Sequence, residues 1–139
     1  MDAIRLLHPR HYSSQLGRFK SLAFKPSSDG SGISIIDCEC ILNTDLSICG
    51  HIRKYHKNTA GEPPIYWRFN IDILPDSHEL EQKDSPSGDK CHYNIKGINR
   101  KSARKFFEDY NDKLHLFQIC RNDNSAQLRK EDLLNIGTR

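Results

Sequence analysis

The sequence contains no long hydrophobic run, and this absence excludes a membrane-spanning helix. A helix that crosses a bilayer needs about 20 mainly apolar residues, and no apolar stretch in the 139 residues approaches that length. The first residues, MDAIRLLHPRHY, also lack the extended apolar core and small-residue cleavage site that are typical of a secretory signal. We therefore expect a cytoplasmic protein that does not bind membranes.

The sequence also lacks the short motifs that identify many enzymes. It has no glycine-rich phosphate-binding loop and no His-Glu-x-x-His zinc motif. It also has no sequence pattern of a Ser-His-Asp catalytic triad and no paired-carboxylate motif. Charge of one sign is not in large excess either, because 21 Lys and Arg residues and 18 Asp and Glu residues give a formal net charge of +3. This mild basicity permits contact with nucleic acid or with an acidic partner without requiring it.

Cysteine is present in an odd number, five, without the regular spacing of a disulfide framework. Free thiols in a reducing compartment are the simplest interpretation. The stretch CECILNTDLSICGHIRKYH nevertheless holds five potential zinc ligands, which are Cys38, Cys40, Cys49, His51 and His56.

The geometry of a helix argues against a zinc site in this stretch. Each helical residue turns by about 100°, so that Cys49 and His51 point apart and Cys49 and His56 lie about 10 Å apart. One ion could use these side chains only if Gly50 broke the helix. We therefore predict no metal and no cofactor, with Cys49 as a small buried apolar residue.

Hydrophobic periodicity predicts a mixture of strands and helices. The alternation in IYWRFNIDIL predicts a strand over residues 65–74, with Trp67 and Phe69 on its apolar face. Shorter strands are predicted over residues 4–9, 33–41 and 91–97. Apolar residues three and four positions apart predict an amphipathic helix over 99–117.

These elements predict an α+β fold. It consists of a small single-domain sheet with one long amphipathic helix (99–117) and a shorter helix (about 44–56) packed on it. Residues 1–117 would form the compact domain, with a mobile loop at 76–90, where apolar residues are almost absent. Residues 118–139 would form a tail with room for a short helix around residues 125–135.

Basic residues are concentrated at the start of the predicted long helix. They are Arg100, Lys101, Arg104 and Lys105. Cations at this end of a helix oppose the macrodipole and cost up to about 1 kcal/mol each, whereas the free amides of the first turn attract phosphates and carboxylates.

Two strands could extend this anion-binding or partner-binding surface. Arg68, His92 and Lys96 lie on the predicted polar faces of the strands at 65–74 and 91–97, and they would join the surface if the two strands pair. The alternative is an ordinary solvated helix face, in which basic residues pair with acidic residues four positions later.

A second candidate site would serve catalysis if the chain is an enzyme. Its residues are His8, Arg18, Ser21, Ser34 and His92. A strand with Arg5 and His8, an aromatic-proline loop and a serine-bearing strand are similar in outline to ADP-ribosyltransferase-like sites. No catalytic glutamate can be assigned, and isolated histidines are more often hydrogen-bonded surface residues than catalytic groups.

Two blocks of the chain resemble a family of small bacterial proteins that has no established activity. The first block is LLHPRHY followed by GRFKSLAFKPSSDGSGISIID, and the second is CHYNIKGINRKSARKFF. The matching positions are His8, Pro9, Gly17, Arg18, Ser21, Ala23, Phe24, Pro26, Ser34 and His92. Ile33 departs from the pattern, which has leucine before the serine. The resemblance implies a compact α+β domain of bacterial origin.

Two classes of function remain. The first, which we favour, is a small intracellular binding module that acts with a protein or nucleic-acid partner, in a setting such as a bacterial defence, conflict or mobile-element system. The second is a small enzyme with an ADP-ribosyltransferase-like or other nucleotide-handling site around His8, Arg18 and Ser34. Convergence of the candidate catalytic residues in one place would favour the enzyme.

Overall fold

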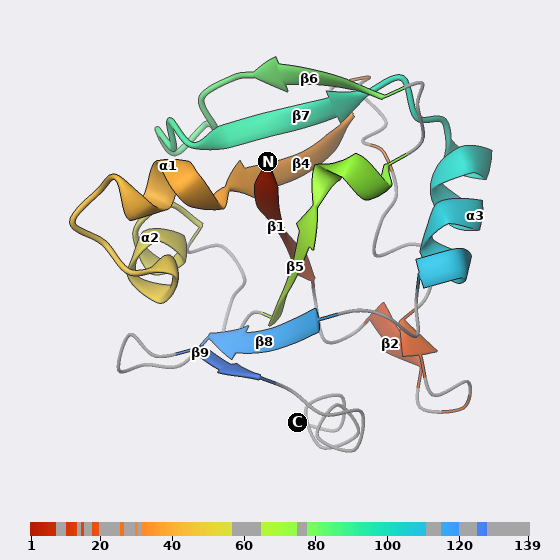
Figure 1. Ribbon diagram of the computed structural model, residues 1–139, viewed down its shortest axis with the longest axis horizontal. Helices are drawn as coiled ribbons and strands as arrows, with labels where there is room; N and C mark the ends of the chain where they lie inside the picture. Colours follow the sequence, from red (N-terminus) through yellow and green to blue (C-terminus); the bar gives the residue numbers. More distant parts are fainter. Residues whose placement is uncertain are drawn as a thin grey trace.

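The computed structural model describes residues 1–7, 11–13, 15, 18–19, 26, 30, 32–56, 65–74, 78–110, 115–119 and 125–127. Within these residues a sheet runs through the molecule, and three α-helices lie beside it (Figure 1). The helices are α1 (Cys38–Leu42), α2 (Ile48–Tyr55) and α3 (Arg100–Tyr110). In the view of Figure 1, α1 and α2 lie together at one end of the molecule and α3 lies at the other.

The main sheet has seven strands, and every neighbouring pair is antiparallel. Its order is β6-β7-β4-β1-β5-β8-β9. The bounds are β1 (Asp2–Leu7), β4 (Ile33–Asp37), β5 (Ile65–Asn70), β6 (Glu79–Gln82), β7 (His92–Lys96), β8 (His115–Ile119) and β9 (Ser125–Gln127). A separate two-stranded ribbon pairs β2 (Tyr12–Ser13) with β3 (Arg18–Phe19).

Both faces of the sheet carry buried apolar residues. Because side chains alternate along a strand, Ala3 and Leu7 of β1 join one core cluster and Ile4 joins the other. The first cluster contains Trp67 and Phe69 of β5 together with Ala103 of α3. The second contains Tyr66 and the buried side chains of α1 and α2, which are Cys38, Ile41, Cys49 and Ile52. Tyr66, on the predicted polar face, is therefore 2% exposed.

The predicted helix over residues 99–117 is wrong, and with it the expectation of a sheet covered by one long helix. Helix α3 ends at Tyr110, and residues 115–119 form strand β8. Backbone pairing of β8 with β5 joins Tyr66 to Phe117 and Trp67 to Leu116. The apolar spacing that resembled a helix therefore belongs partly to a strand, because tertiary pairing overrides local periodicity.

The shorter helix and the strand before it also differ from prediction. Strand β4 ends at Asp37, whose carboxylate accepts a hydrogen bond from the Glu39 amide and starts α1. The second helix begins only after Ser47, whose hydroxyl accepts from the Gly50 amide, so α2 is shorter than the predicted 44–56. An aspartate and a serine at the cap position supply the oxygen that satisfies a free amide of the first turn.

The segment predicted as a loop and the predicted tail both contain strands. Glu79–Gln82, within 76–90, form β6 at one edge of the sheet. Beyond residue 117, β8 continues to Ile119 and Ser125–Gln127 form β9, whereas residues 128–135 of the expected tail helix lie outside the described residues.

The burial of Trp67 and Phe69 agrees with the predicted apolar face of their strand. Their side chains are 2% and 6% exposed, and their rings stack with centroids 4.2 Å apart. Ala103 of α3 belongs to the same cluster. The side chains of Phe106, Phe107 and Tyr110, on the same helix, lie outside the described part of the structure.

Candidate functional site

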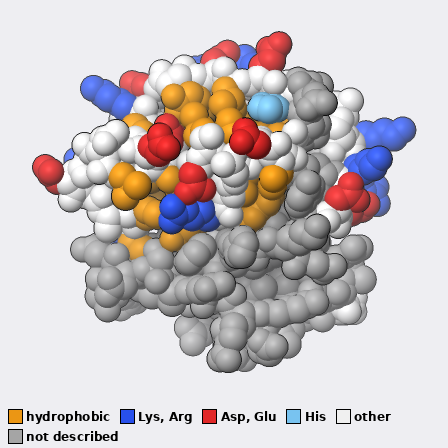
Figure 2. Space-filling model, in the orientation of Figure 1, with side chains coloured by type: hydrophobic (Ala, Val, Ile, Leu, Met, Phe, Trp, Pro, Cys, Tyr) orange, Lys and Arg blue, Asp and Glu red, His pale blue; other side chains and the backbone are white. Residues whose placement is uncertain are grey.

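The outer face of α3 carries the four basic residues found in the sequence. We call Arg100, Lys101, Arg104 and Lys105 the basic surface of α3. All four are exposed, whereas Ala103 on the opposite side of the helix is 1% exposed in the core. With about 100° per residue, the four positions span about 140° of the helix circumference. Lys and Arg side chains gather at the right-hand edge of Figure 2, where α3 lies in the same orientation of Figure 1.

The start of α3 is capped by a neutral side chain. Asn99 Oδ1 accepts hydrogen bonds from the Ser102 amide and the Ser102 hydroxyl, both at 2.8 Å. The Asn99 backbone carbonyl also accepts a hydrogen bond from the Ala103 amide. No acidic residue occupies the first turn, so nothing in that turn offsets the adjacent positive charges.

Only one cation of the basic surface of α3 has an ionic partner within the part of the chain that the structure describes. Arg104 Nε lies 3.2 Å from Glu108 Oε1, four positions later, as the solvated-face interpretation expects. This exposed pair contributes little to stability, because long side chains lose conformational freedom and water screens the charges. Arg100, Lys101 and Lys105 form no ion pair in these ranges.

The other predicted anion-binding residues are not brought together by strand pairing. Strands β5 and β7 do not pair, because β4 and β1 lie between them. Arg68 of β5 forms an ion pair with Asp2, with Nη2 and Oδ2 2.7 Å apart, and this hydrogen bond raises the pKa of Arg68. Lys96 of β7 lies 2.8 Å from Glu81 Oε2 and lowers the pKa of that carboxyl.

Two of the five candidate catalytic residues are in contact. The Ser34 hydroxyl of β4 donates to His92 Nε2 of β7, and His92 Nδ1 donates to the Lys83 carbonyl at 2.7 Å. With Nδ1 protonated, Nε2 is free to accept the serine proton, which is the arrangement that a nucleophile and its base require. Arg5 adds a hydrogen bond to the Ser34 carbonyl at 2.9 Å, and burial lowers the pKa of its guanidinium to about 10.

The remaining three residues of that set cannot be placed. His8 and Ser21 lie outside the described residues, and Arg18 belongs to β3 without a described side chain. Whether they approach Ser34 and His92 therefore stays a prediction.

Cys49 and His51 point apart on α2, as the helix geometry predicts. Gly50 lies inside a continuous α2 and does not break it. Cys49 is fully buried in the second core cluster, whereas His51 points to a different group of residues. Cys38 is also buried, and its burial, followed by the nearby Asp2, raises the pKa of its thiol to about 12.

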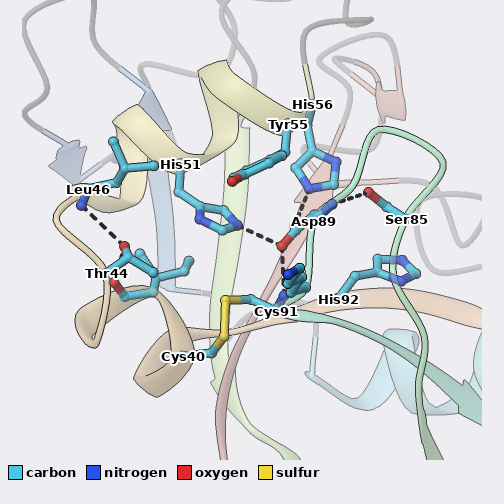
Figure 3. A network of polar contacts seen from close by, with 12 residues as sticks. Cys40, Thr44, Leu46, His51, Tyr55, His56, Ser85, Asp89, Cys91 and His92 are labelled. Carbon is cyan, nitrogen blue, oxygen red and sulfur yellow. Dashed lines mark hydrogen bonds and ion pairs between the residues drawn. A yellow bond between two sulfur atoms is a disulfide. The ribbon is translucent and has the colours of Figure 1, made fainter.

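A buried carboxylate, Asp89, connects α2 to the turn before β7 (Figure 3). His51 Nε2 donates to Asp89 Oδ1 at 2.9 Å, and His56 Nε2 donates to Oδ2 at 2.6 Å. The Cys91 amide also donates to Oδ1, at 2.8 Å. Burial alone would raise the pKa of Asp89, but these hydrogen bonds lower it far below its usual value, so that the carboxylate is charged.

A disulfide lies beside this network and corrects the expectation of free thiols at two positions. Cys40 of α1 and Cys91, directly before β7, are bonded across 51 positions of the sequence. Antiparallel pairing of β4 with β7 brings the two segments together, because α1 continues from the end of β4 at which β7 begins. Cys38 and Cys49 remain thiols.

Comparison with known proteins yields no match to a protein-family model, a curated protein or a solved structure. The resemblance to small bacterial proteins therefore stays a prediction, and the function is inferred from the geometry of the residues alone.

Asp89 and Cys91 are the site residues that sequence reasoning missed. Asp89 lies in a polar segment that was expected to be a loop, and its partners His51 and His56 are more than 30 positions away. Cys91 was expected only as the first residue of the strand over 91–97. The signal that could have found both is their spacing, because Asp89-x-Cys91 places a carboxylate and a thiol at the start of a strand.

Proposed function

We propose that this protein is a small binding module whose basic surface of α3 contacts an anionic partner, either the phosphates of a nucleic acid or an acidic protein surface. The observation that carries the proposal is the position of four exposed cations on one face of α3, two of which, Arg100 and Lys101, lie in the first turn, where positive charge is unfavourable. A binding role accounts for a charge arrangement that helix stability alone disfavours.

Three further features support a contact surface rather than a structural role. Asn99 caps the helix by accepting from the Ser102 amide, and Lys and Arg side chains have no acceptor atom with which to do so, so capping does not explain the cations. Ala103 anchors the opposite side of α3 in the core, which holds the basic surface rigidly. Arg100, Lys101 and Lys105 are exposed and form no ion pair with a described residue, so a partner would not have to break internal salt bridges.

We place this function in the cytoplasm of a bacterial cell, within a system such as conflict, defence or mobile-element control. Among the described helices, the longest has 11 residues and none could cross a membrane.

Reversing two charges of the basic surface of α3 tests the proposal. We expect Arg100→Glu with Lys101→Glu to weaken binding to a short DNA duplex or to the partner recovered from native lysate. For duplex DNA, loss of two phosphate contacts should flatten the dependence of log affinity on log salt by about 2 units. Titration by fluorescence anisotropy at several salt concentrations measures both effects.

The matched control is Lys83→Glu with Lys90→Glu, which changes the net charge equally at two exposed positions before β7. This control should reproduce only the small effect of net charge. Circular dichroism should show a folded double variant, because glutamates suit the first turn of a helix. Equal binding by the two double variants would contradict the proposal.

A second candidate function rests on the contact between Ser34 and His92. In this alternative the chain is a small enzyme, with Ser34 as nucleophile and His92 as base, acting on a nucleotide or similar substrate. The hydrogen bond from His92 Nδ1 to the Lys83 carbonyl supports it by fixing the tautomer that leaves Nε2 free.

An activated Ser34 should react with a fluorophosphonate probe. We expect labelling of the wild-type protein, no labelling of Ser34→Ala, and labelling slower by at least about 100-fold in His92→Gln, because a positioned base contributes about that much. Ser87→Ala removes another exposed hydroxyl and should keep the wild-type rate. Absence of labelling in the wild-type protein would contradict the assignment of Ser34 as an activated nucleophile.

A further inference from the structure

We propose that opening the Cys40–Cys91 disulfide creates a zinc site whose protein ligands are His51, Asp89 and Cys91. One potential ligand atom from each residue lies within 4.8 Å of the other two, and all three residues are buried. The site lies on α2 and the turn before β7, and it does not involve the basic surface of α3. It goes beyond the proposed binding function and does not depend on it.

The three donor atoms suit zinc in both chemistry and spacing. Zinc binds thiolate sulfur, imidazole nitrogen and carboxylate oxygen in a tetrahedron, in which ligand atoms lie about 3.3 to 3.8 Å apart. His51 Nε2 and Asp89 Oδ1 are 2.9 Å apart, and no pair in the cluster exceeds 4.8 Å. Shifts of about 1 Å or less would therefore bring the three atoms to the required positions.

The surrounding structure already orients these ligands. His56 Nε2 donates to Asp89 Oδ2 at 2.6 Å, which leaves Oδ1 directed toward His51. The Ser85 hydroxyl accepts from the Asp89 amide at 3.0 Å and holds the turn. Such contacts behind a metal ligand fix its orientation and strengthen binding.

The two ring nitrogens of His51 have different surroundings, since Nε2 faces Asp89 and Nδ1 does not. Its side chain is 2% exposed, and its Nδ1 has no hydrogen-bond partner within the described part of the structure. A buried polar atom without a partner costs about 1 to 3 kcal/mol. Zinc on Nε2 would leave this cost unchanged, so the donor set and its spacing carry the proposal.

The redox step balances with a small dithiol as the reductant. The dithiol supplies two electrons and two protons, the Sγ–Sγ bond of Cys40 and Cys91 breaks, and two cysteine thiols form while the dithiol becomes a cyclic disulfide. Zinc binding then displaces the thiol proton of Cys91 to solvent, and the His51 proton moves from Nε2 to Nδ1 so that Nε2 can bind the ion. Oxidation of the two cysteines by a disulfide reverses both changes and releases the ion. The oxidised protein therefore does not bind zinc at this site, whereas the reduced protein does.

Cobalt titration of the wild-type protein tests this inference. In the presence of a phosphine reductant, Co²⁺ should give the ligand-field bands of a tetrahedral site and a thiolate charge-transfer band. Zn²⁺ should displace the bound Co²⁺ at about one ion per chain. The oxidised protein should show neither band. Absence of the bands in reduced, folded protein would overturn the proposal, and so would equal binding by the oxidised protein.

Two serine variants separate the ligand from the disulfide. Both Cys40→Ser and Cys91→Ser remove the disulfide, but only Cys91→Ser removes a residue of the three-ligand cluster. We expect Cys40→Ser to bind Co²⁺ without reductant and Cys91→Ser to bind it more than about 100-fold more weakly. Cys49→Ala, which alters a buried thiol outside the cluster, should bind as the wild type does. Equal affinities in the two serine variants would exclude Cys91 as a ligand.

Loss of folding would not hide the result. If Cys40→Ser is unfolded without metal, circular dichroism during Zn²⁺ addition should report refolding, because binding to the assembled site favours the folded state. Refolding of Cys91→Ser at the same Zn²⁺ concentration would contradict the assignment.

Discussion

Replacing Trp67 with alanine should lower the free energy of unfolding by about 3 to 5 kcal/mol, the usual cost of removing a large aromatic side chain from a core. Trp67 is 2% exposed in β5 and stacks on Phe69 with ring centroids 4.2 Å apart. Its cluster also contains Ala3 and Leu7 of β1, so the cavity would lie within that buried cluster. Urea unfolding followed by circular dichroism measures the change.

Leu42→Ala is the matched control for this prediction. Leu42 is an apolar residue of α1 that is 69% exposed, so its truncation should change the free energy of unfolding by about 0.5 kcal/mol or less. A loss below about 1 kcal/mol for Trp67→Ala would show that the cluster around Trp67 is not a packed core.

Removing the Cys40–Cys91 disulfide should lower the free energy of unfolding by about 4 kcal/mol in the presence of a chelator. This value is the loop-entropy estimate for a link between cysteines 51 positions apart, since the open chain gains freedom mainly in its unfolded state. Chemical unfolding of Cys40→Ala with Cys91→Ala, compared with the oxidised wild type, measures it.

Reductant provides the control for the disulfide. It should destabilise the wild-type protein by a similar amount and leave the double variant unchanged, because the remaining described cysteines, Cys38 and Cys49, are thiols already. A loss below about 1 kcal/mol in both experiments would show that the link does not constrain the unfolded chain.

The strands with clear alternation were predictable, whereas the ends of elements depended on contacts from distant residues. The pattern around Trp67 and Phe69 identified a strand, although it continued the strand through a segment that forms a 3₁₀ helix, Ile71–Ile73. Around residue 115 the local pattern favoured a helix, but pairing with β5 decided the outcome. Periodicity reports which residues are apolar, and in a short segment it does not determine whether a helix or a strand buries them.

The same distinction applies to the candidate sites. Those built from neighbouring residues could be predicted, and those built from residues far apart in the sequence could not. The basic surface of α3 could be found from the sequence, because its four residues are neighbours on one helix. The contact of Ser34 with His92 depends on the pairing of β4 with β7. The cluster of His51, Asp89 and Cys91 depends on the position of α2 beside the turn before β7, which no local pattern specifies.

Amide chemical-shift mapping tests the central claim, that the basic surface of α3 is the contact surface, most directly. Nitrogen-15-labelled protein would be titrated with a short DNA duplex, or with the partner recovered from lysate, at low salt. We predict that the largest changes occur at the amides of residues 99–105 and disappear in Arg100→Glu with Lys101→Glu. Changes that are largest around Lys83 and Lys90, or that persist in the double variant, would contradict the assignment of this surface.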